Sequence, residues 1–323
     1  MFDIVFLGTS ASAPSIHRGL SAAAVLAGED RFLVDCGEGT QRQILRSGIG
    51  FKKLNHIMLT HGHLDHILGL GGLVSTFTRW ETIDDFTIWG GATTLNRVHD
   101  LLFNVVFAHQ TPPVPVHLKP VEAGVFYQGK KFTVTAFPVV HRGPDCYGYV
   151  FEEEDHRPFL AEKADALGVP FGPERSQLVR GEAVTLTDGR IVQPEDVLGA
   201  TVPGVKVVFT GDVGRVEPLL PYVQDADALV IEGTFMQEEA DMARRFGHLT
   251  IRQGAEIAQQ ANVRNLLITH VSRRYRERDM LEEAQAIFPE VHIVRDFDHF
   301  SIRRDKPMVK SKASYRNMPE SNS

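Results

Sequence analysis

Cysteine is scarce in this chain of 323 residues, which contains only Cys36 and Cys146. The two make no CxxC pair and are too few for a disulfide framework, so we expect buried, reduced thiols. Long apolar runs are also missing, and no stretch approaches the roughly 18 residues of a membrane span. The first segment, MFDIVFLGTS, has an early acidic residue and no basic region of the kind that starts a signal peptide. These absences predict a cytoplasmic protein with no membrane partner.

Positive charge is not in excess either. The chain has 34 Lys and Arg against 41 Asp and Glu, a formal net charge of -7. This balance argues against a surface that binds polyanions over its whole area, although a local basic patch is compatible with it. Histidine, in contrast, is frequent, with 14 residues. The positions of these histidines matter more than their number.

Short β-rich runs alternate with helix-like stretches in both halves of the chain, which is typical of an α/β protein. The expected strands are 2–8, 21–28, 31–37, 56–61, 86–91, 131–140, 147–154, 205–212, 228–233, 265–270 and 292–297. The expected helices are 38–48, 66–80, 249–263 and 278–288. Five of the strands end in polar residues. Layered α/β architectures usually build their site at the carboxyl ends of strands, so we expect it there.

Two segments depart from this pattern. Residues 155–200 have few regular apolar repeats and several Gly and Pro, which indicates an insertion with little core of its own. A mobile surface loop is the simpler alternative for this segment. The tail 305–323 is polar and lacks periodicity, so we expect it to be disordered. Residues 1–304, with the insertion, would then form the folded domain.

Residues 60–66, THGHLDH, place three histidines and an aspartate at the end of a strand. Residues two apart in an extended segment face the same way, so His61 and His63 can present their imidazoles to one cation. Asp65 and His66 follow in the turn that leads to the next helix. Imidazole and carboxylate suit zinc or manganese, and two such ions roughly 3.5–4 Å apart can share a hydroxide nucleophile. An accidental surface cluster is the alternative.

Further candidate ligands stand at three later strand ends: His141, Asp212 and His270. Asp212, in FTGD, could bridge two cations by giving one oxygen to each. Together with the THGHLDH run these residues supply seven donors, enough for two sites of four ligands if Asp212 is shared. The imidazoles must be neutral to bind metal, so metal affinity should fall below about pH 6.5.

This order of HxHxDH, a distant His, an Asp and a final His resembles the metallo-β-lactamase superfamily and, within it, the ribonuclease Z family of tRNA 3′-processing endonucleases. The matching segments are FLGTSASAPS (6–15), VDCGEGTQRQ (34–43), THGHLDHILGL (60–70), VVHRGPDCYGY (139–149), VVFTGDV (207–213), VIEGTF (230–235), GHLT (247–250) and THVSRRY (269–275). The resemblance implies a four-layer αββα sandwich with two zinc ions and an inserted tRNA-binding arm at about 155–200. It also implies a homodimer that acts on precursor tRNA, with no DNA partner expected.

The resemblance assigns the seven donors to two ions, one held by His61, His63, His141 and Asp212 and the other by Asp65, His66, Asp212 and His270. Asp65 would also orient or deprotonate the attacking water, while the metals neutralise charge on the phosphate. His248, in GHLT, matches the histidine proposed to protonate the leaving 3′ oxygen, and Glu232 matches the carboxylate that keeps it protonated. An ordinary salt bridge is the alternative for Glu232.

Five further residues have weaker assignments around this centre. Asp35 could accept the spare N–H of a ligand imidazole, or it could merely cap the next helix. Thr40, with Gln41, would brace the same loop. Ser272 and Arg274, in THVSRRY, could bind a phosphate near the scissile bond. An ordinary exposed arginine is the alternative reading of Arg274.

Gly172 and Pro173 match a Gly-Pro pair that ribonuclease Z relatives carry in an arm that grips the tRNA elbow. Between residues 155 and 200, however, eight Asp and Glu outnumber five Lys and Arg. Phosphate contacts contribute much of the affinity for RNA, so this acidic balance weakens the expected grip. Binding would depend on a local cluster formed by Arg175, Arg180 and Arg190.

The leading hypothesis is a zinc endoribonuclease, with manganese as the alternative metal, that cuts precursor tRNA after the discriminator and leaves a 3′ hydroxyl on the tRNA. A small-molecule phosphodiesterase on the same scaffold would share every metal residue and differ in having no need of the arm. A noncatalytic RNA-binding protein that keeps the metals for stability is the third hypothesis. The presence of Glu232 and His248 argues against it.

Overall fold

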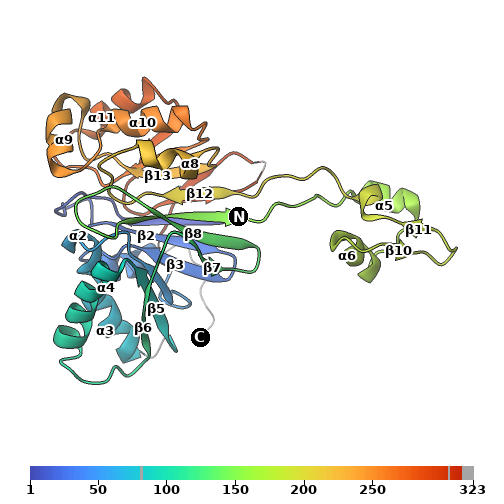
Figure 1. Cartoon of the computed structure of the whole chain (residues 1–323), viewed down its shortest axis with the longest axis horizontal. Helices are drawn as coiled ribbons and strands as arrows, with labels where there is room; N and C mark the ends of the chain where they lie inside the picture. Colours follow the sequence, from blue (N-terminus) through green and yellow to red (C-terminus); the bar gives the residue numbers. More distant parts are fainter. Residues whose placement is uncertain (81–82, 305, 315–323) are drawn as a thin grey trace. The chain divides into compact units, whose positions relative to one another are not determined.

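The computed structural model describes residues 1–80, 83–304 and 306–314, and the chain divides into two units (Figure 1). The larger unit contains Met1–Glu152 and the chain from Val205 onward. The smaller unit is Glu153–Gly204. Cys36 and Cys146 are buried free thiols, as the sequence predicted. None of the helices in the described ranges is long and apolar enough to cross a membrane.

The first sheet of the larger unit has eight strands in the order β17-β16-β1-β2-β3-β4-β5-β6. These strands are β1 (Phe2–Gly8), β2 (Ala22–Ala27), β3 (Asp30–Val34), β4 (His56–Met58), β5 (Phe86–Gly90), β6 (Val116–Pro120), β16 (Asp298–Ile302) and β17 (Val309–Lys312). Strands β3 to β6 pair in parallel. Parallel neighbours need crossover connections, and helices supply them here.

The second sheet has seven strands in the order β15-β14-β13-β12-β9-β8-β7. These strands are β7 (Gly124–Gln128), β8 (Phe132–Pro138), β9 (Tyr147–Glu153), β12 (Lys206–Phe209), β13 (Ala228–Glu232), β14 (Leu266–Thr269) and β15 (Val291–Ile293). Strands β12 to β15 are parallel. Their carboxyl ends therefore lie at one edge of the sheet, which brings together the segments that follow them.

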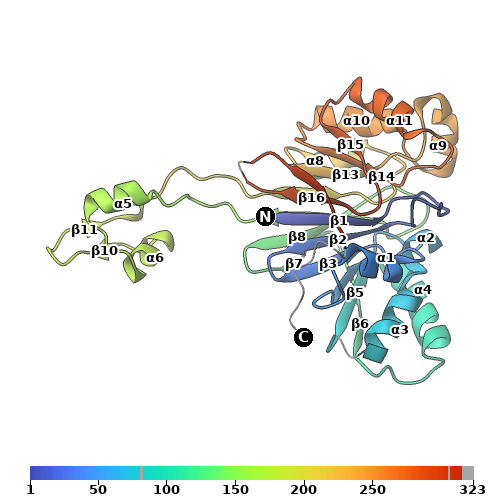
Figure 2. The same ribbon diagram turned by 180° about the vertical axis from the view of Figure 1, so that it is seen from behind.

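Helices flank the outer face of each sheet (Figures 1 and 2). The first sheet is accompanied by α1 (Thr40–Ser47), α2 (Leu64–Ile67), α3 (Leu70–Trp80), α4 (Ala92–His99) and the π-helix η1 (Asp100–Val106). The second is accompanied by the 3-10 helices η2 (Glu217–Leu219) and η3 (Gln237–Glu239), and by α8 (Leu220–Val223), α9 (Ala240–Phe246), α10 (Ile251–Gln260) and α11 (Glu277–Gln285). This is the predicted αββα architecture.

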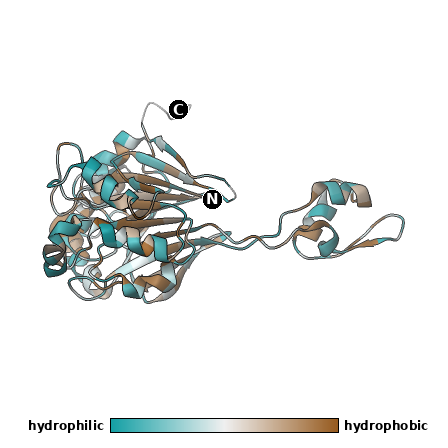
Figure 3. Ribbon diagram, turned by 90° about the horizontal axis from the view of Figure 1, so that it is seen from above, coloured by the Kyte–Doolittle hydropathy of each residue, from teal (hydrophilic) through white to brown (hydrophobic). Residues whose placement is uncertain are grey.

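Three apolar clusters hold the four layers of the larger unit together. Between the two sheets lies a core rich in aromatic side chains that includes Phe2, Phe6, Phe32, Phe151 and Phe300. The other two clusters fill the spaces between each sheet and its helices. Figure 3 shows the same distribution, with mostly hydrophobic strands inside and hydrophilic segments on the covering helices. Burial of these apolar surfaces is the main stabilising contribution to the sandwich.

Four strands of the larger unit were not predicted from the sequence. They lie at or next to a sheet edge and carry polar side chains, so their apolar pattern is weak. They are β6, β7, β16 and β17. Strand β17 overturns the expected disorder of the tail at Val309–Lys312, where all four residues are exposed but pair with β16. Lys310 and Lys312 also form ion pairs with the buried Asp298. Residues 305 and 315–323 of the expected tail lie outside the described residues.

The smaller unit is a folded segment with its own core, where the sequence predicted little core. It contains α5 (Ala161–Leu167), α6 (Pro173–Val179), the hairpin of β10 (Val184–Thr185) and β11 (Ile191–Val192), and α7 (Pro194–Val197). Its core is formed by the buried Ala164, Val169, Leu178, Val184, Leu186, Val192 and Val197. Antiparallel bridges between residues 156 and 202 and between 159 and 198 join its two ends.

Candidate metal centre

The seven predicted donors meet at the edge of the sandwich where β4, β8, β12 and β14 end. Two groups of ligand atoms form there, with the atoms of each group within 4.8 Å of one another: His61, His63, His141 and Asp212 in the first, and Asp65, His66 and His270 in the second. A third group of this kind combines Asp212, His248 and His270. The structure therefore brings together residues that are more than 200 positions apart in the chain.

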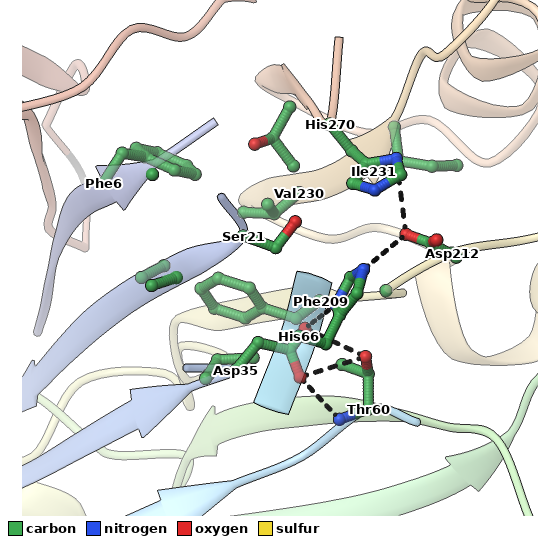
Figure 4. A pocket seen from close by; sticks show the side chains of 16 residues that line it. Phe6, Ser21, Asp35, Thr60, His66, Phe209, Asp212, Val230, Ile231 and His270 are labelled. Carbon is green, nitrogen blue, oxygen red and sulfur yellow. Dashed lines mark hydrogen bonds and ion pairs between the residues drawn. The ribbon is translucent and has the colours of Figure 1, made fainter. Parts of the chain in front are cut away.

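The two oxygens of Asp212 face two different sets of histidines. Oδ1 lies 3.5 Å from His66 Nε2 and 3.5 Å from His270 Nδ1. Oδ2 lies 3.7 Å from His61 Nε2 and 3.8 Å from His141 Nε2. Figure 4 shows Asp212 with His66 and His270 pointing toward it. A carboxylate in this position can give one oxygen to each of two cations.

Asp65 and His63 complete the two groups. His63 Nδ1 lies 3.3 Å from His141 Nε2, and Asp65 Oδ2 lies 3.4 Å from His270 Nε2. The backbone N–H of Ser12 donates a hydrogen bond of 3.0 Å to the same oxygen of Asp65. Ser12 lies in the matching segment FLGTSASAPS (6–15), but the sequence assigned it no role, because the contact is made by its backbone.

The donor atoms have the properties that a metal site requires. Nε2 of His61 and of His66 is buried and has no hydrogen-bond partner within the described residues. An unsatisfied buried polar atom is costly, and coordination of a cation would satisfy both nitrogens. Burial lowers the pKa of His61, His63 and His141, which favours the neutral imidazole that binds metal.

His66 behaves differently because it faces two carboxylates. Burial disfavours its charged form, but Asp212 and Asp35 outweigh that effect and raise the pKa of His66. Two buried carboxylates around one imidazole are a local excess of negative charge, which a divalent cation would neutralise. The excess of negative charge and the unsatisfied nitrogens both indicate that this donor set fits metal ions.

Asp35 orients two of the imidazoles. His66 Nδ1 donates to Asp35 at 2.8 Å, and the Thr60 hydroxyl donates to the same carboxylate at 2.9 Å (Figure 4). Because the Thr60 proton is used in this way, its oxygen accepts from His61 Nδ1 at 3.0 Å. Both histidines therefore keep Nε2 for a metal. The N-cap of α1 is Gly39 and has no side-chain cap, so Asp35 does not take the capping role.

Two further candidate ligands, His141 and His270, are held in the same manner. His141 Nδ1 donates to the carbonyl oxygen of Gly247 at 2.7 Å. Thr234 donates its hydroxyl proton to Glu232 at 2.5 Å and lies 3.0 Å from His270 Nδ1. Thr60 and Thr234 were not predicted from the sequence. Their signal is position alone, since Thr60 immediately precedes His61 and Thr234 stands two residues after Glu232.

Glu232 is buried at the end of β13 and accepts three hydrogen bonds. Besides Thr234, these come from the backbone N–H of Val213 at 2.7 Å and from His248 Nδ1 at 2.9 Å. Burial lowers the pKa of His248, but the adjacent Glu232 carboxylate outweighs it and raises that pKa to about 9. This raised pKa favours the protonated imidazole of His248 at neutral pH. His248 faces a cleft that Asp65 and Asp212 also line.

Thr40 and Gln41 secure the loop that carries Asp35. The Thr40 hydroxyl donates to the Gly37 carbonyl at 2.7 Å, and the Gln41 amide bonds to Thr76 on α3. Their contacts fix the turn between β3 and α1.

Arg274 and Ser272 are placed beyond the last ligand. The Arg274 guanidinium lies 2.9 Å from Glu239 Oε1, and its backbone N–H donates to the Ser272 hydroxyl at 3.3 Å. The positive charge of Arg274 thus already has a carboxylate partner. An exposed, paired arginine agrees better with the alternative, an ordinary surface residue, than with an arginine whose charge is free to bind a phosphate.

In the smaller unit, Gly172 is the N-cap of α6 and Pro173 is its first residue. The three arginines expected to form a basic cluster each pair with a carboxylate of their own unit: Arg175 with Asp165, Arg180 with Glu182 and Arg190 with Asp188. These pairs compensate the charge that was expected to attract RNA. Phe171, next to the Gly-Pro pair, is 93% exposed.

Comparison with known proteins gives the relatives of this chain. A model of the beta-lactamase superfamily domain matches residues 30–194 and 168–271. Ribonuclease Z of Bradyrhizobium diazoefficiens is 46% identical over 302 residues, which cover 94% of this chain and 100% of that protein. Ribonuclease Z of Gemmatimonas aurantiaca is 38% identical over 295 residues, covering 90% of this chain and 93% of that protein.

Two solved structures share the fold. The short form of human tRNase Z aligns with a TM-score of 0.63 at 22% identity and covers 94% of this chain and 100% of its own. The metallo-beta-lactamase fold protein YhfI of Bacillus subtilis has a TM-score of 0.65 at 20% identity, covering 91% and 97%. At these identities the structures bear on the fold alone.

Proposed function

The chain belongs to the ribonuclease Z family of the metallo-β-lactamase superfamily, and on this premise we propose how its residues process the 3′ ends of tRNA. It is a metal-dependent phosphodiester hydrolase that acts as a tRNA 3′-processing endoribonuclease. The observation that carries the proposal is the convergence of seven donors, Asp212 among them, next to the hydrogen-bonded pair of His248 and Glu232.

Two divalent ions suit the donor set, and we propose that they are zinc, with manganese as the alternative. One would be held by His61, His63, His141 and Asp212, and the other by Asp65, His66, Asp212 and His270. When bound, the ions lower the pKa of a water molecule and neutralise charge that develops on the phosphate. The remaining chemistry belongs to side chains of this protein.

Asp65 is the residue proposed to orient the attacking water and to accept its proton. Its carboxylate lines the cleft, while Ser12 and His270 contact a single oxygen, Oδ2. Those two contacts fix the direction of the carboxylate. A water molecule that donates a hydrogen bond to it would be held in one orientation toward the phosphorus atom.

His248 is proposed to protonate the leaving 3′ oxygen. Its Nδ1 is bonded to Glu232, so Nε2 is the nitrogen that can deliver a proton. Glu232 is itself held by Val213 and Thr234, which keeps the imidazole in one position. Proton transfer to the leaving oxygen produces a tRNA that ends in a 3′ hydroxyl and a trailer that begins with a 5′ phosphate.

The decisive experiment is mapping of cleavage ends on a precursor tRNA transcript that lacks CCA, with and without a chelator. We expect one main cut after the discriminator, a 3′ hydroxyl on the tRNA product and no cut after chelation. A product ending in a 2′,3′-cyclic phosphate would contradict the proposal, because that product requires attack by the ribose 2′ hydroxyl rather than by water.

We also propose that the smaller unit contacts the tRNA. In support, it has a core of its own and presents the exposed Phe171 beside Gly172 and Pro173. Aromatic faces and backbone groups can bind RNA without a large basic field. The paired state of Arg175 and Arg180 predicts that this contact depends little on salt.

A homodimer in the cytoplasm completes the proposal. Apolar side chains stay exposed on helices of the larger unit, namely Leu45 on α1, Leu64 and the following Leu68 at α2, and Val105 on η1. Such residues are candidates for an interface between two copies. For the proposed homodimer, light scattering should measure twice the mass of one subunit, which is 36.0 kDa.

The compartment is proposed from the cysteines. The free, buried thiols of Cys36 and Cys146 suit a reducing compartment.

A further inference from the structure

The cleft in front of the candidate metal centre has a volume of about 310 Å³ and is lined by more than the proposed catalytic groups. Three of its lining residues have no part in metal binding or proton transfer: Arg142, Phe235 and Phe246. An aromatic pair and an arginine beside a phosphodiester-cleaving centre are the groups that bind a nucleobase and a phosphate.

Phe246 is the last residue of α9, and its side chain is 39% exposed in this cleft. Its ring is parallel to that of Phe235, with an angle of 7° between the planes and 6.5 Å between the centroids. Phe235 in turn lies 6.2 Å from the ring of His248. The aromatic surface therefore extends from the proposed proton donor to the partly exposed ring of Phe246. The guanidinium of the exposed Arg245 lies 5.7 Å from the centroid of that ring, so a base that stacks on this side would displace a solvent-exposed side chain.

The backbone geometry keeps this surface next to His248. Gly247, between Phe246 and His248, has a φ of +71°, a conformation that glycine adopts without strain. Its carbonyl oxygen accepts the hydrogen bond from the ligand His141. The turn that ends α9 thus ties Phe246 and His248 to one of the metal-ligand groups.

Arg142 lies over the same turn. A Cβ at Gly247 would come within 2.8 Å of Arg142 Cγ, so the aliphatic part of the arginine packs closely against the glycine. Within residues 1–80, 83–304 and 306–314, no carboxylate forms an ion pair with its guanidinium. The charge of Arg142 is therefore available to a phosphate group, in contrast to that of Arg274, which Glu239 compensates.

We propose that Phe246 and Arg142 form a nucleotide subsite, in which Phe246 stacks on a base of the substrate and Arg142 pairs with an adjacent phosphate. The base is that of the discriminator, the last nucleotide kept by the tRNA. This assignment rests on the proposed function, because the nucleotide that carries the leaving 3′ oxygen must lie beside its proton donor His248. The aromatic surface begins at that residue.

A thermodynamic cycle tests the stacking contact. Precursor tRNA with a normal discriminator and with an abasic discriminator is cleaved by the wild type, Phe246→Leu and Phe246→Tyr. Leucine keeps apolar volume but removes the π face, whereas tyrosine keeps the face. We expect Phe246→Leu to lower kcat/KM by about tenfold on the normal precursor and to match the wild type within about twofold on the abasic one. Phe246→Tyr should retain wild-type behaviour on both.

An equal loss for Phe246→Leu on the normal and the abasic precursor would overturn the stacking assignment, since the defect would then not involve the base. Equal defects in the Leu and Tyr variants would overturn it as well. Failure of the wild type to cleave either precursor would instead contradict the proposed function, so the two failures are distinguishable.

Salt dependence tests the phosphate contact. We expect Arg142→Ala to reduce the slope of log kcat/KM against log salt by about one, because one phosphate contact is lost, while Arg142→Lys retains the slope. Arg278→Ala is the control, since Arg278 is exposed on α11 and pairs with Glu282. An unchanged slope in Arg142→Ala, or the same reduction in Arg278→Ala, would overturn the assignment of Arg142.

Discussion

His248 and Glu232 form a direct hydrogen bond, with 2.9 Å between Nδ1 and Oε1. The backbone N–H of Val213 donates to the same oxygen of the carboxylate, and the hydroxyl of Thr234 donates to the other oxygen, Oε2. This pair stands next to the proposed metal ligands, since His248 Nδ1 is also 3.8 Å from Asp212 Oδ2. Its arrangement leads to the first prediction.

Replacement of His248 by Ala should slow cleavage of precursor tRNA by about 10² to 10⁴-fold, because the ribose 3′ oxygen is a poor leaving group without a proton. The fold loss in the rate of bis(p-nitrophenyl) phosphate hydrolysis should be at least about ten times smaller, since p-nitrophenolate leaves without protonation. Steady-state rates on both substrates provide the measurement. Equal losses on the two would show that His248 has no role as a general acid.

Removal of the carboxylate proposed to bridge the two ions should empty the metal centre. We expect Asp212→Asn to bind less metal by elemental analysis and to lose at least about 100-fold in activity, because even residues that only support a ligand typically contribute 10–100-fold. Asp241→Asn is the matched control, since Asp241 is exposed on α9 and pairs with Arg244. Full metal content in Asp212→Asn would contradict the bridging role.

Thr234 offers a test of how ligands are oriented. Valine has nearly the same shape but no hydroxyl, so Thr234→Val should leave the buried Oε2 of Glu232 without its hydrogen-bond donor and His270 Nδ1 without its hydroxyl partner. We expect a loss of about 1–3 kcal/mol in the free energy of unfolding and a 10–100-fold weaker metal affinity. Denaturant unfolding and competition with a chelator measure the two effects. Thr78→Val, which removes only a bond within α3, should change neither.

A pH effect on stability is expected far from the metal centre, at Asp3 on β1. Burial alone would raise its pKa, but hydrogen bonds from His299, Ser301 and Arg303 outweigh this and lower the pKa of Asp3 to about 2. A carboxylate with a depressed pKa stabilises the fold above its unfolded value of about 3.9 and loses that contribution as the pH falls toward 2. With allowance for partial exposure, we expect about 1–2 kcal/mol at pH 7.

The measurement for Asp3 is the difference in unfolding free energy between the wild type and Asp3→Asn, both with metal removed. The difference should be constant from pH 7 to about 5 and should shrink between about pH 4 and 2. A difference that does not change with pH over this range would show that the charge of Asp3 does not contribute.

Deletion of residues 158–198 should separate the tRNA-processing function from simple phosphodiesterase activity. The chain enters and leaves this segment at neighbouring positions, since Arg157 Nε donates to the Gly199 carbonyl at 2.9 Å. A short glycine linker can therefore close the gap. We expect tRNA cleavage to be lost while hydrolysis of a small chromogenic phosphodiester continues. Retained tRNA cleavage would show that the larger unit binds precursor tRNA without the smaller unit.

Local patterns in the sequence were sufficient for the donor set and for most of the sandwich. The THGHLDH spacing and the polar ends of strands placed His61, Asp212 and His270 at the site, because strand periodicity and residue chemistry act over a few positions. The same patterns did not predict edge strands such as β17. Its residues are all exposed, and it is held by backbone pairing and by lysine contacts with Asp298, which no periodicity records.

By itself, then, the sequence determined the fold class, the identity of the seven residues that converge at the candidate metal centre and the alternation of strands and helices. The tertiary structure alone decided which oxygen of Asp212 faces which histidines, and it revealed the supporting contacts of Thr60 and Thr234. It also placed Phe246 in the cleft and paired the arginines of the smaller unit with carboxylates. The physical reason is that these relations join groups far apart in the chain, such as Asp65 and His270, which are 205 positions apart. Only the packing of the two sheets and their loops can set such distances.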